Sequence, residues 1–77
     1  MRQTYQVKDL YLAAFLRVQG RILIRTIREQ TVCWFVFQGK TGCEELANQY
    51  WSDTALVKVK SYVDSIQTMK DLIYARR

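Results

Sequence analysis

Hydrophobic side chains recur at steps of three and four residues through the last third of the chain. Such spacing places them along one face of an α-helix, and it predicts a long amphipathic helix of about five turns. The stripe could pack on the rest of the domain or against a second copy of the chain. It consists of Leu56, Val59, Tyr62, Val63, Ile66, Met69 and Ile73.

A second, more apolar helical segment lies near the start of the chain. Tyr5 and Val7 alternate with polar neighbours, as in a short strand, and Asp9 stands where a helix N-cap would accept amide hydrogen bonds. The helix should run almost to Gly20, which supplies the left-handed residue that commonly ends a helix. Because this segment has hardly any polar face, we expect it to be enclosed at the centre of the core.

Two runs rich in β-branched and aromatic residues, 21–28 and 31–38, predict an antiparallel hairpin with residues 29–30 as its loop. That loop would pair Arg25 with Trp34 and divide the side chains between two faces. One face would carry Ile22, Ile24, Thr26, Cys33, Phe35 and Phe37. The other would carry Arg21, Leu23, Arg25, Ile27, Val32, Trp34, Val36 and Gln38.

Another helix is predicted after the hairpin. Thr41 and Glu44 have the T-x-x-E spacing of a capping box, and apolar residues follow at helical spacing until a break near Ser52 and Asp53. The order of elements is therefore β-α-β-β-α-α. We expect one small α+β domain over residues 1–77, with a small antiparallel sheet and a long C-terminal amphipathic helix.

The length of 77 residues suffices for one modest core, and the composition, 49% apolar and 25% charged, is typical of globular proteins. No apolar run reaches the ~18 residues that span a bilayer, and the N-terminus lacks the apolar segment of a secretion signal. We therefore expect a cytoplasmic protein with reduced thiols and no membrane partner.

The net charge of +5 is confined to the first half of the chain. Residues 1–40 carry seven Lys or Arg and two Asp or Glu, whereas residues 41–77 carry five of each kind. This asymmetry favours a partner rich in phosphates, and it is also a common way of staying soluble. The basic residues of the first half are Arg2, Lys8, Arg17, Arg21, Arg25, Arg28 and Lys40.

In the predicted hairpin, Trp34 projects between Arg21 and Arg25, an arrangement that could stack a base and neutralise flanking phosphates. The same face carries several aliphatic side chains, so the competing interpretation is burial under the C-terminal helix or against a second copy. The predicted nucleic-acid site, for DNA or RNA, consists of Arg21, Arg25, Arg28, Trp34 and Lys40.

Gly39, Lys40 and Thr41 match the end of the phosphate-binding loop motif G-x-x-x-x-G-K-[ST]. The first glycine of that motif would fall at position 34, where the indole of Trp34 prevents a close approach of backbone to phosphate. Thr41 is moreover predicted to cap a helix. A nucleotide loop is therefore disfavoured, which leaves the free amides of this helix start, with Lys40, as contacts for a phosphate of a larger ligand.

Catalytic chemistry has little support in the sequence. The chain has no histidine, the commonest general base and nitrogen ligand, and Cys33 and Cys43 are too few for a zinc site. Glu44 and Glu45 would point ~100° apart on a helix and cannot act as a pair. Cys43, in the first turn of a helix, would have a lowered pKa but no base to activate it. We expect no catalytic residue, metal or cofactor.

The segment YQVKDLYLAAFL at residues 5–16, followed by the basic hairpin with WFVF and by the EELANQYW helix, resembles a family of small uncharacterised domains encoded by bacteria and their phages. The likeness covers nearly the whole chain. It implies a compact α+β domain of bacterial or phage origin, and it carries no functional residues.

The charge and the predicted site together favour a non-enzymatic nucleic-acid-binding accessory protein that forms a homodimer. One alternative is a protein-interaction module, for example a phage or mobile-element factor that binds a host protein through apolar surfaces. Another is a structural homodimer of no further known role.

Overall fold

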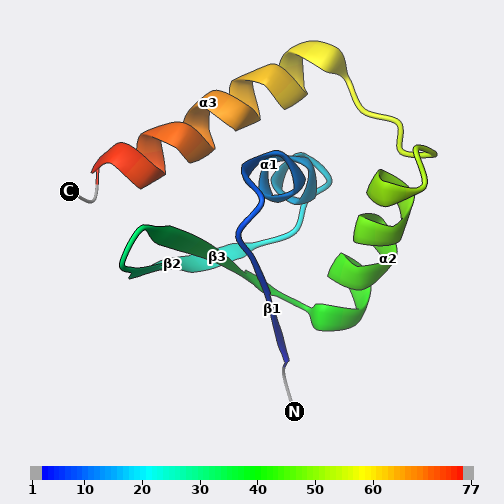
Figure 1. Ribbon diagram of the computed structural model, residues 1–77. Coiled ribbons are helices and arrows are strands. Elements are labelled where there is room, and N and C mark those ends of the chain that lie inside the picture. Colours follow the sequence, from blue (N-terminus) through cyan, green and yellow to red (C-terminus); the bar gives the residue numbers. More distant parts are fainter. Residues whose placement is uncertain (1–2, 76–77) are drawn as a thin grey trace.

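The computed structural model describes residues 3–75 and contains a three-stranded antiparallel sheet and three helices within them (Figure 1). The predicted α+β class and the order β-α-β-β-α-α are confirmed. Arg2, counted above among the basic residues, lies outside the described residues. The elements are β1 (Thr4–Val7), α1 (Leu10–Val18), β2 (Leu23–Glu29), β3 (Val32–Gln38), α2 (Lys40–Trp51) and α3 (Val59–Ala75).

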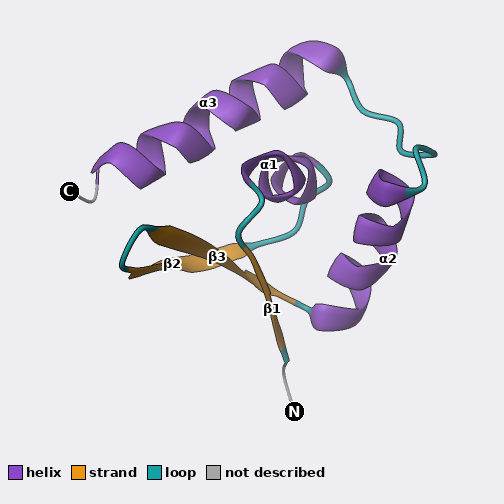
Figure 2. Ribbon diagram, in the orientation of Figure 1, coloured by secondary structure: helices purple, strands orange, loops and turns teal. Residues whose placement is uncertain are grey.

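The elements form layers, with α1 between the sheet and α3 and with α2 along one end of the sheet (Figure 2). The strand order is β1-β3-β2, so the hairpin partner of β2 is also the centre of the sheet. Side chains from one side of the sheet join the helices in a single core. Its buried members are Val7, Leu12, Ala13, Ala14, Phe15, Leu16, Phe35, Phe37, Cys43, Ala47 and Met69.

Helix α1 is capped and enclosed as the sequence predicts. Both Tyr11 N and Leu12 N donate to an Oδ1 atom of Asp9, at 2.8 and 3.1 Å, which satisfies amides at the start of the helix. Gly20 has a φ of +94° just after the last turn. Five consecutive residues, 12–16, are buried, because the sheet covers one side of α1 and α3 covers another.

The hydrophobic stripe of the C-terminal helix divides between two environments. Met69 is buried, and Tyr62, Ile66 and Ile73 pack partly against the core. The apolar positions at its start do not pack there: Leu56 precedes the first residue of α3, and Val59 and Val63 lie in its first turns outside the core. Their exposed fractions are 88% for Leu56, 76% for Val59 and 54% for Val63.

The predicted register of the hairpin is wrong. Glu29 pairs with Val32, so the loop consists of Gln30 and Thr31, one residue later than predicted. Gln30 makes the turn in the left-handed region, with a φ of +55°. Trp34 therefore lies opposite Ile27, whereas Arg25 was predicted at that position.

A register shift between Leu23 and Arg25 also changes the predicted faces of β2. Leu23 pairs with Phe37 and packs against the core, although it was assigned to the opposite face. Ile22 and Ile24, which were assigned to the core face, are 61% and 43% exposed. The extra residue in β2 explains the exchange, because a slip of one residue moves side chains to the other face of a sheet.

The predicted capping box at the start of α2 is also wrong. The helix begins at Lys40, with Gly39 as the N-cap residue at a φ of +84°, and within residues 3–75 no side chain caps it. The amides of Gly39 and Lys40 instead donate to the carbonyl of Gln3, at 3.1 and 3.3 Å. A backbone acceptor next to β1 thus satisfies amides at the start of α2, and the N-cap residue lies two positions before the predicted Thr41.

Candidate nucleic-acid interface

The sheet has one side that the described helices leave uncovered, which we call the open face. Alternation along β3 sends Phe35 and Phe37 into the core and Trp34 and Val36 to the opposite side. None of the residues on that side belongs to the cluster of buried residues that the sheet forms with the helices. By strand pairing and alternation, the open face consists of Thr4, Gln6, Lys8, Arg25, Ile27, Glu29, Val32, Trp34, Val36 and Gln38.

Val36 is fully buried although it lies on the open face. Its partners in the two flanking strands are Gln6 and Arg25, whose longer side chains lie on either side of it. The middle of the face is thus aliphatic, with Val36 between the polar side chains of Gln6 and Arg25. This explains how a sheet face rich in apolar residues can face solvent without a helix over it.

Trp34 is half-buried on the same face, with Ile27 as its partner in β2. The ammonium of Lys8 lies 5.9 Å from the centroid of the indole ring, within the range of a cation–π contact. Lys8 comes from the residue just after β1, which pairs with β3 on the side away from β2. The open face therefore presents an aromatic ring with a cation directly over it.

The structure separates the five predicted site residues. Arg25 and Trp34 share the open face, but Arg21 does not lie beside Trp34 as predicted. Its Nη2 donates to the carbonyl of Gln38 at 3.2 Å, and its guanidinium lies against the start of α2. The Nε atom of Arg21 is buried and has no hydrogen-bond partner among the described residues.

Arg28 lies on the core side of the sheet, opposite Cys33. Its Nη2 donates to the carbonyl of Ile73 in the last turn of α3. A cation at a helix C-terminus satisfies a free carbonyl and complements the helix dipole, so this contact ties the hairpin to α3. Arg28 is thereby directed away from the open face.

Lys40 is exposed at the first residue of α2. Together with Arg21 it lines an open hollow of about 430 Å³ at the start of that helix. The amides of Gly39 and Lys40, which are the first at this helix start, are already bonded to the carbonyl of Gln3. Of the donors expected at this end of α2, the two outermost are therefore occupied by the chain itself.

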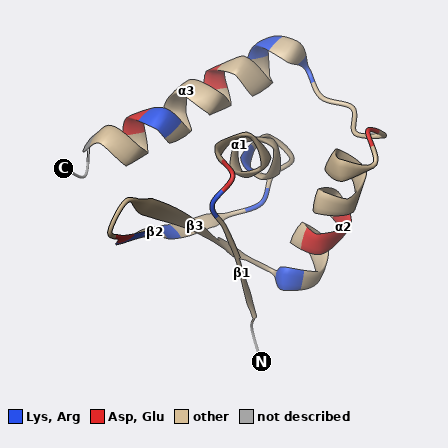
Figure 3. Cartoon of the chain, in the orientation of Figure 1, with Lys and Arg blue, Asp and Glu red and all other residues tan. Residues whose placement is uncertain are grey.

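The grouping that the structure does produce is Lys8, Arg25 and Trp34, with Glu29 as the one carboxylate of the described strands, at the end of the hairpin. The other described acidic positions lie on the helices and their flanking segments (Figure 3). Lys8 was missed because its place depends on the pairing of β1 with β3. Alternation within the first strand could have placed it on the face of Gln6, but not beside Trp34.

The pKa of the Cys43 thiol differs from the predicted one. Burial raises its pKa above the usual value, while the neighbouring Arg21 acts in the opposite direction and is outweighed. The predicted lowering of the pKa is therefore wrong, because Cys43 is fully buried between α2 and the sheet. Its Sγ donates to the carbonyl of Gln38 at 3.6 Å.

Cys33 and Cys43 are both free thiols. Within residues 3–75, no group of three or more His, Cys, Asp or Glu side chains is placed to hold a metal ion. In the same part of the chain, none of the helices combines the length and the hydrophobicity that crossing a bilayer requires.

The fold and the open face define a small α+β domain whose three-stranded sheet is covered by helices on one side and bears a tryptophan and two cations on the other. A family model described as a domain of unknown function (DUF5659) matches residues 2–75, and the chain belongs to that family. No curated protein and no solved structure matches the chain.

Proposed function

We propose that the protein is a non-enzymatic accessory protein of bacterial or phage origin that binds DNA or RNA with unpaired bases on the open face of its sheet. The observation that supports this is the position of Trp34. Its ring is half-buried on a face that no described helix covers, with Lys8 and Arg25 on the same face. Had Trp34 been covered within the monomer, a stacking role would have been impossible.

In this proposal an unpaired base stacks on the indole of Trp34. The base displaces the ammonium of Lys8, which is exposed and moves to an adjacent phosphate. Arg25, also exposed, contacts the next phosphate along the strand. A base in a duplex is already stacked and paired, so this surface selects single strands, loops or ends.

The contacts are few, so binding should be weak and dependent on salt. One base stacked on an aromatic side chain contributes about 1–3 kcal/mol. Two phosphate contacts on a single strand give a slope of about −1.4 in log K against log salt concentration. We therefore expect micromolar affinity for a short oligonucleotide, and no strong preference for one sequence.

The test is a fluorescence anisotropy titration with labelled single-stranded DNA, single-stranded RNA and duplex DNA at about 50 and 200 mM salt. Single strands should bind more tightly than the duplex, and the affinity should fall as salt rises. Trp34→Leu, which keeps an apolar side chain beside Ile27, should weaken binding by about 5- to 150-fold, as the loss of one stacked base predicts.

Trp51→Leu is the matched control, because Trp51 is an exposed tryptophan at the end of α2, away from the open face. Lys8→Gln and Arg25→Gln should each reduce the salt slope, whereas Lys60→Gln on α3 should not. The proposal fails if no oligonucleotide binds at about 50 mM salt, or if Trp34→Leu and Trp51→Leu have the same effect.

A second candidate function, a protein-interaction module that includes a homodimer of this chain, has its own supporting observation. Leu56, Val59 and Val63 are largely exposed around the first turns of α3. Adjacent exposed aliphatic side chains of this kind mark docking surfaces in soluble proteins. Light scattering at high micromolar concentration should give a dimeric mass that Val59→Lys lowers, and a strictly monomeric wild-type protein would exclude the homodimer.

A further inference from the structure

A hollow of about 460 Å³ lies where the end of α2, the middle of α1 and the first turns of α3 meet. This size is within the range of small-molecule sites. Aromatic side chains from all three helices form most of its wall, and the connection after α2 provides a carboxylate and two aliphatic residues. The lining residues are Phe15, Tyr50, Trp51, Asp53, Ala55, Val57 and Tyr62.

Tyr50 lies at the centre of this aromatic wall. Its ring centroid is 5.8 Å from that of Phe15 and 4.9 Å from that of Trp51. It is also close enough to Tyr62 to raise the pKa of that hydroxyl, after burial as the larger cause. The planes of Tyr50 and Trp51 are nearly perpendicular, at 86°. A ligand in the angle between perpendicular rings contacts a ring face, which carries the negative part of the quadrupole.

The wall is closed at the back and open at the rim. Phe15 is buried, Tyr50 and Tyr62 are half-buried, and Trp51 is 66% exposed at the end of α2. A cation that reaches the inner rings leaves part of its water behind. The attraction between a cation and an aromatic face is stronger for such desolvated contacts than on an open surface.

Asp53 is the one charged residue in the wall. The amides of residues 52–54 donate to main-chain carbonyls of residues 48–50, which fixes the chain around Asp53 just after α2. Asp53 itself has a φ of +62°, a conformation that glycine or asparagine commonly supplies at a helix end. Within residues 3–75 its carboxylate forms no ion pair and no hydrogen bond. An unpaired carboxylate beside aromatic faces favours a cationic ligand.

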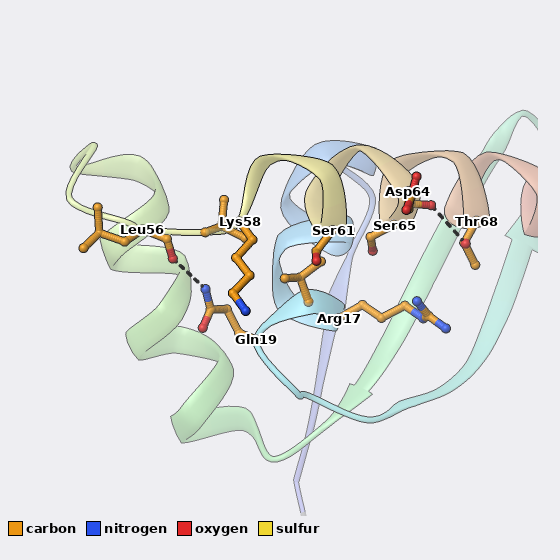
Figure 4. Close-up of a pocket in the computed structure, with 10 residues that line it drawn as sticks. Arg17, Gln19, Leu56, Lys58, Ser61, Asp64, Ser65 and Thr68 are labelled. Carbon is orange, nitrogen blue, oxygen red and sulfur yellow. Dashed lines mark hydrogen bonds between the residues drawn. The ribbon is translucent and has the colours of Figure 1, made fainter.

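The charges of the surrounding chain have the same sign as Asp53. Residues 41–57 carry three carboxylates and no Lys or Arg, in a chain with a net charge of +5 (Figure 3). Lys58 follows directly, but its side chain lines another hollow, between α1 and α3, together with Gln19 (Figure 4). There the Nε2 of Gln19 donates to the carbonyl of Leu56 at 3.1 Å, which holds the connection against the end of α1. The aromatic hollow is therefore an acidic part of a basic protein.

The composition of the wall favours one kind of cation. Primary ammonium and guanidinium groups carry several N–H donors and need an acceptor for each. Asp53 is the only carboxylate in the wall, and the hydroxyl of Tyr62 donates to the carbonyl of Tyr11. A quaternary ammonium group has no N–H donor, and aromatic rings are the surroundings in which proteins recognise such groups.

We propose that this hollow binds the quaternary ammonium group of a small organic cation. The methyl groups of the ligand lie against the rings of Tyr50 and Trp51, with Phe15 behind them. The carboxylate of Asp53 balances the charge from the rim. This site shares no residue with the open face and is independent of nucleic-acid binding there.

The test is a ¹H–¹⁵N NMR titration of the full chain with choline chloride up to about 20 mM, with sodium chloride as the blank. Choline should shift the indole N–H signal of Trp51 and the amide signals around Asp53, and sodium chloride should not. Dimethylbutanol, the uncharged analogue in which carbon replaces the nitrogen of choline, should bind about 2- to 30-fold more weakly, because it lacks the attraction of a cation to the rings.

Two variants test the wall, each with a matched control. Trp51→Leu should weaken choline binding about 2- to 30-fold, the range for one cation–π contact, whereas Trp34→Leu should not. Asp53→Asn should weaken it about 2- to 5-fold, as the loss of one exposed charge pair predicts, and asparagine tolerates the positive φ. Its control is Glu45→Gln, because Glu45 is an exposed carboxylate of α2 outside the wall. The same spectra show whether each variant keeps the fold.

The proposal is overturned if choline shifts none of these signals, if dimethylbutanol binds as tightly as choline, or if Trp51→Leu and Trp34→Leu have the same effect on choline binding. A peptide that carries trimethyl-lysine distinguishes the source of the quaternary group. Tighter binding of that peptide than of choline would replace the small molecule by a modified protein side chain.

The two proposals fail separately. If both hold, Trp34→Leu loses oligonucleotide binding and keeps choline binding, and Trp51→Leu shows the reverse pattern.

Discussion

Two side-chain hydrogen bonds join α3 to α1. The effect of removing the more exposed one, formed by Tyr62, can be predicted quantitatively. The hydroxyl of Tyr62 donates to the carbonyl of Tyr11 at 3.0 Å, and the buried hydroxyl of Ser65 donates to the carbonyl of Ala14 at 3.0 Å. The change Tyr62→Phe removes the first bond and keeps the ring that packs beside the core. The loss of unfolding free energy in this variant should therefore be due to the hydroxyl group alone.

The size of the effect follows from the environment of the bond. A net contribution of about 0.5–1.5 kcal/mol is usual for one hydrogen bond. The carbonyl of Tyr11 lies in a helix and also accepts the main-chain bond of the next turn, so Tyr62→Phe leaves no acceptor unsatisfied. We expect a loss of about 0.5–1 kcal/mol at pH 7, which lowers the melting temperature by roughly 2–8 °C in a domain of this size.

The effect should also depend on pH. Burial, with the nearby Tyr50 as the next cause, raises the pKa of Tyr62 from 10.0 to about 12. The folded state thus holds the phenolic proton more tightly than the unfolded state. The stabilisation is complete below pH 10 and is lost as the pH rises towards 12. A shift of that size corresponds to roughly 2.7 kcal/mol, which we reduce to about 1 kcal/mol because solvent screens a half-buried group.

The assay is urea denaturation of wild type and Tyr62→Phe between pH 7 and 11, followed by tryptophan fluorescence. The difference in unfolding free energy should be constant up to about pH 9 and then shrink towards zero. Tyr11→Phe is the control, because it keeps the accepting carbonyl and changes an exposed ring. A difference that stays constant to pH 11, or an equal loss in Tyr11→Phe, would refute the reasoning.

Three further changes test the packing of the domain. Gly20→Ala and Gly39→Ala both force an alanine to a positive φ, +94° and +84°, at a cost of about 1–2 kcal/mol, but only at Gly39 does the new methyl group enter space filled by a guanidinium. Thermal unfolding should therefore show the larger loss for Gly39→Ala, and equal losses would contradict that packing. Met69→Ala should destabilise by about 2–5 kcal/mol in urea denaturation, because it empties a fully buried site, and a loss below this range would place Met69 outside the core. In the native protein, mass spectrometry after iodoacetamide treatment should find Cys33 modified before Cys43, which is buried and has a raised pKa, and the opposite order would contradict its burial.

The sequence predicted those parts of the fold that depend on local signals. Asp9 and Gly20 bound the first helix because capping and a left-handed end are encoded by neighbouring residues. Four inward positions of α3 were predicted for the same reason, since residues three and four apart share a helix face; they are Tyr62, Ile66, Met69 and Ile73. Val63 of the predicted stripe is 54% exposed, and the buried Ser65 was not predicted. The first residue of α3 was not predicted, because the apolar spacing begins at Leu56 although the helix begins only at Val59.

The hairpin register depended on signals that the chain lacks. No glycine or asparagine marks the turn, so a loop of Gln30 and Thr31 could not be distinguished from one a residue earlier. Leu23 faces the core where Ile22 and Ile24 were predicted to do so, and this outcome depends on packing against the finished core. Sequence alternation alone predicts a regular strand and therefore misses the extra residue.

The candidate site was predicted in part. Trp34 and Arg25 do share one face, because alternation within each strand survives a shift of register by two residues. Arg28 was assigned by charge and Arg21 by the predicted register, whereas both form hydrogen bonds with main-chain carbonyls elsewhere in the fold. Lys8 could be placed beside Trp34 only with the long-range pairing of β1 and β3.

The central position of β3 leaves both other strands as edges of the sheet. β1 has only four residues, and β2 is interrupted by its register shift and carries exposed arginines on both faces. Short, irregular or charged edges resist the addition of a strand from another molecule. A dimer of this protein would accordingly join helices or sheet faces, each sheet would end at three strands, and growth into cross-β fibrils would have no ready template.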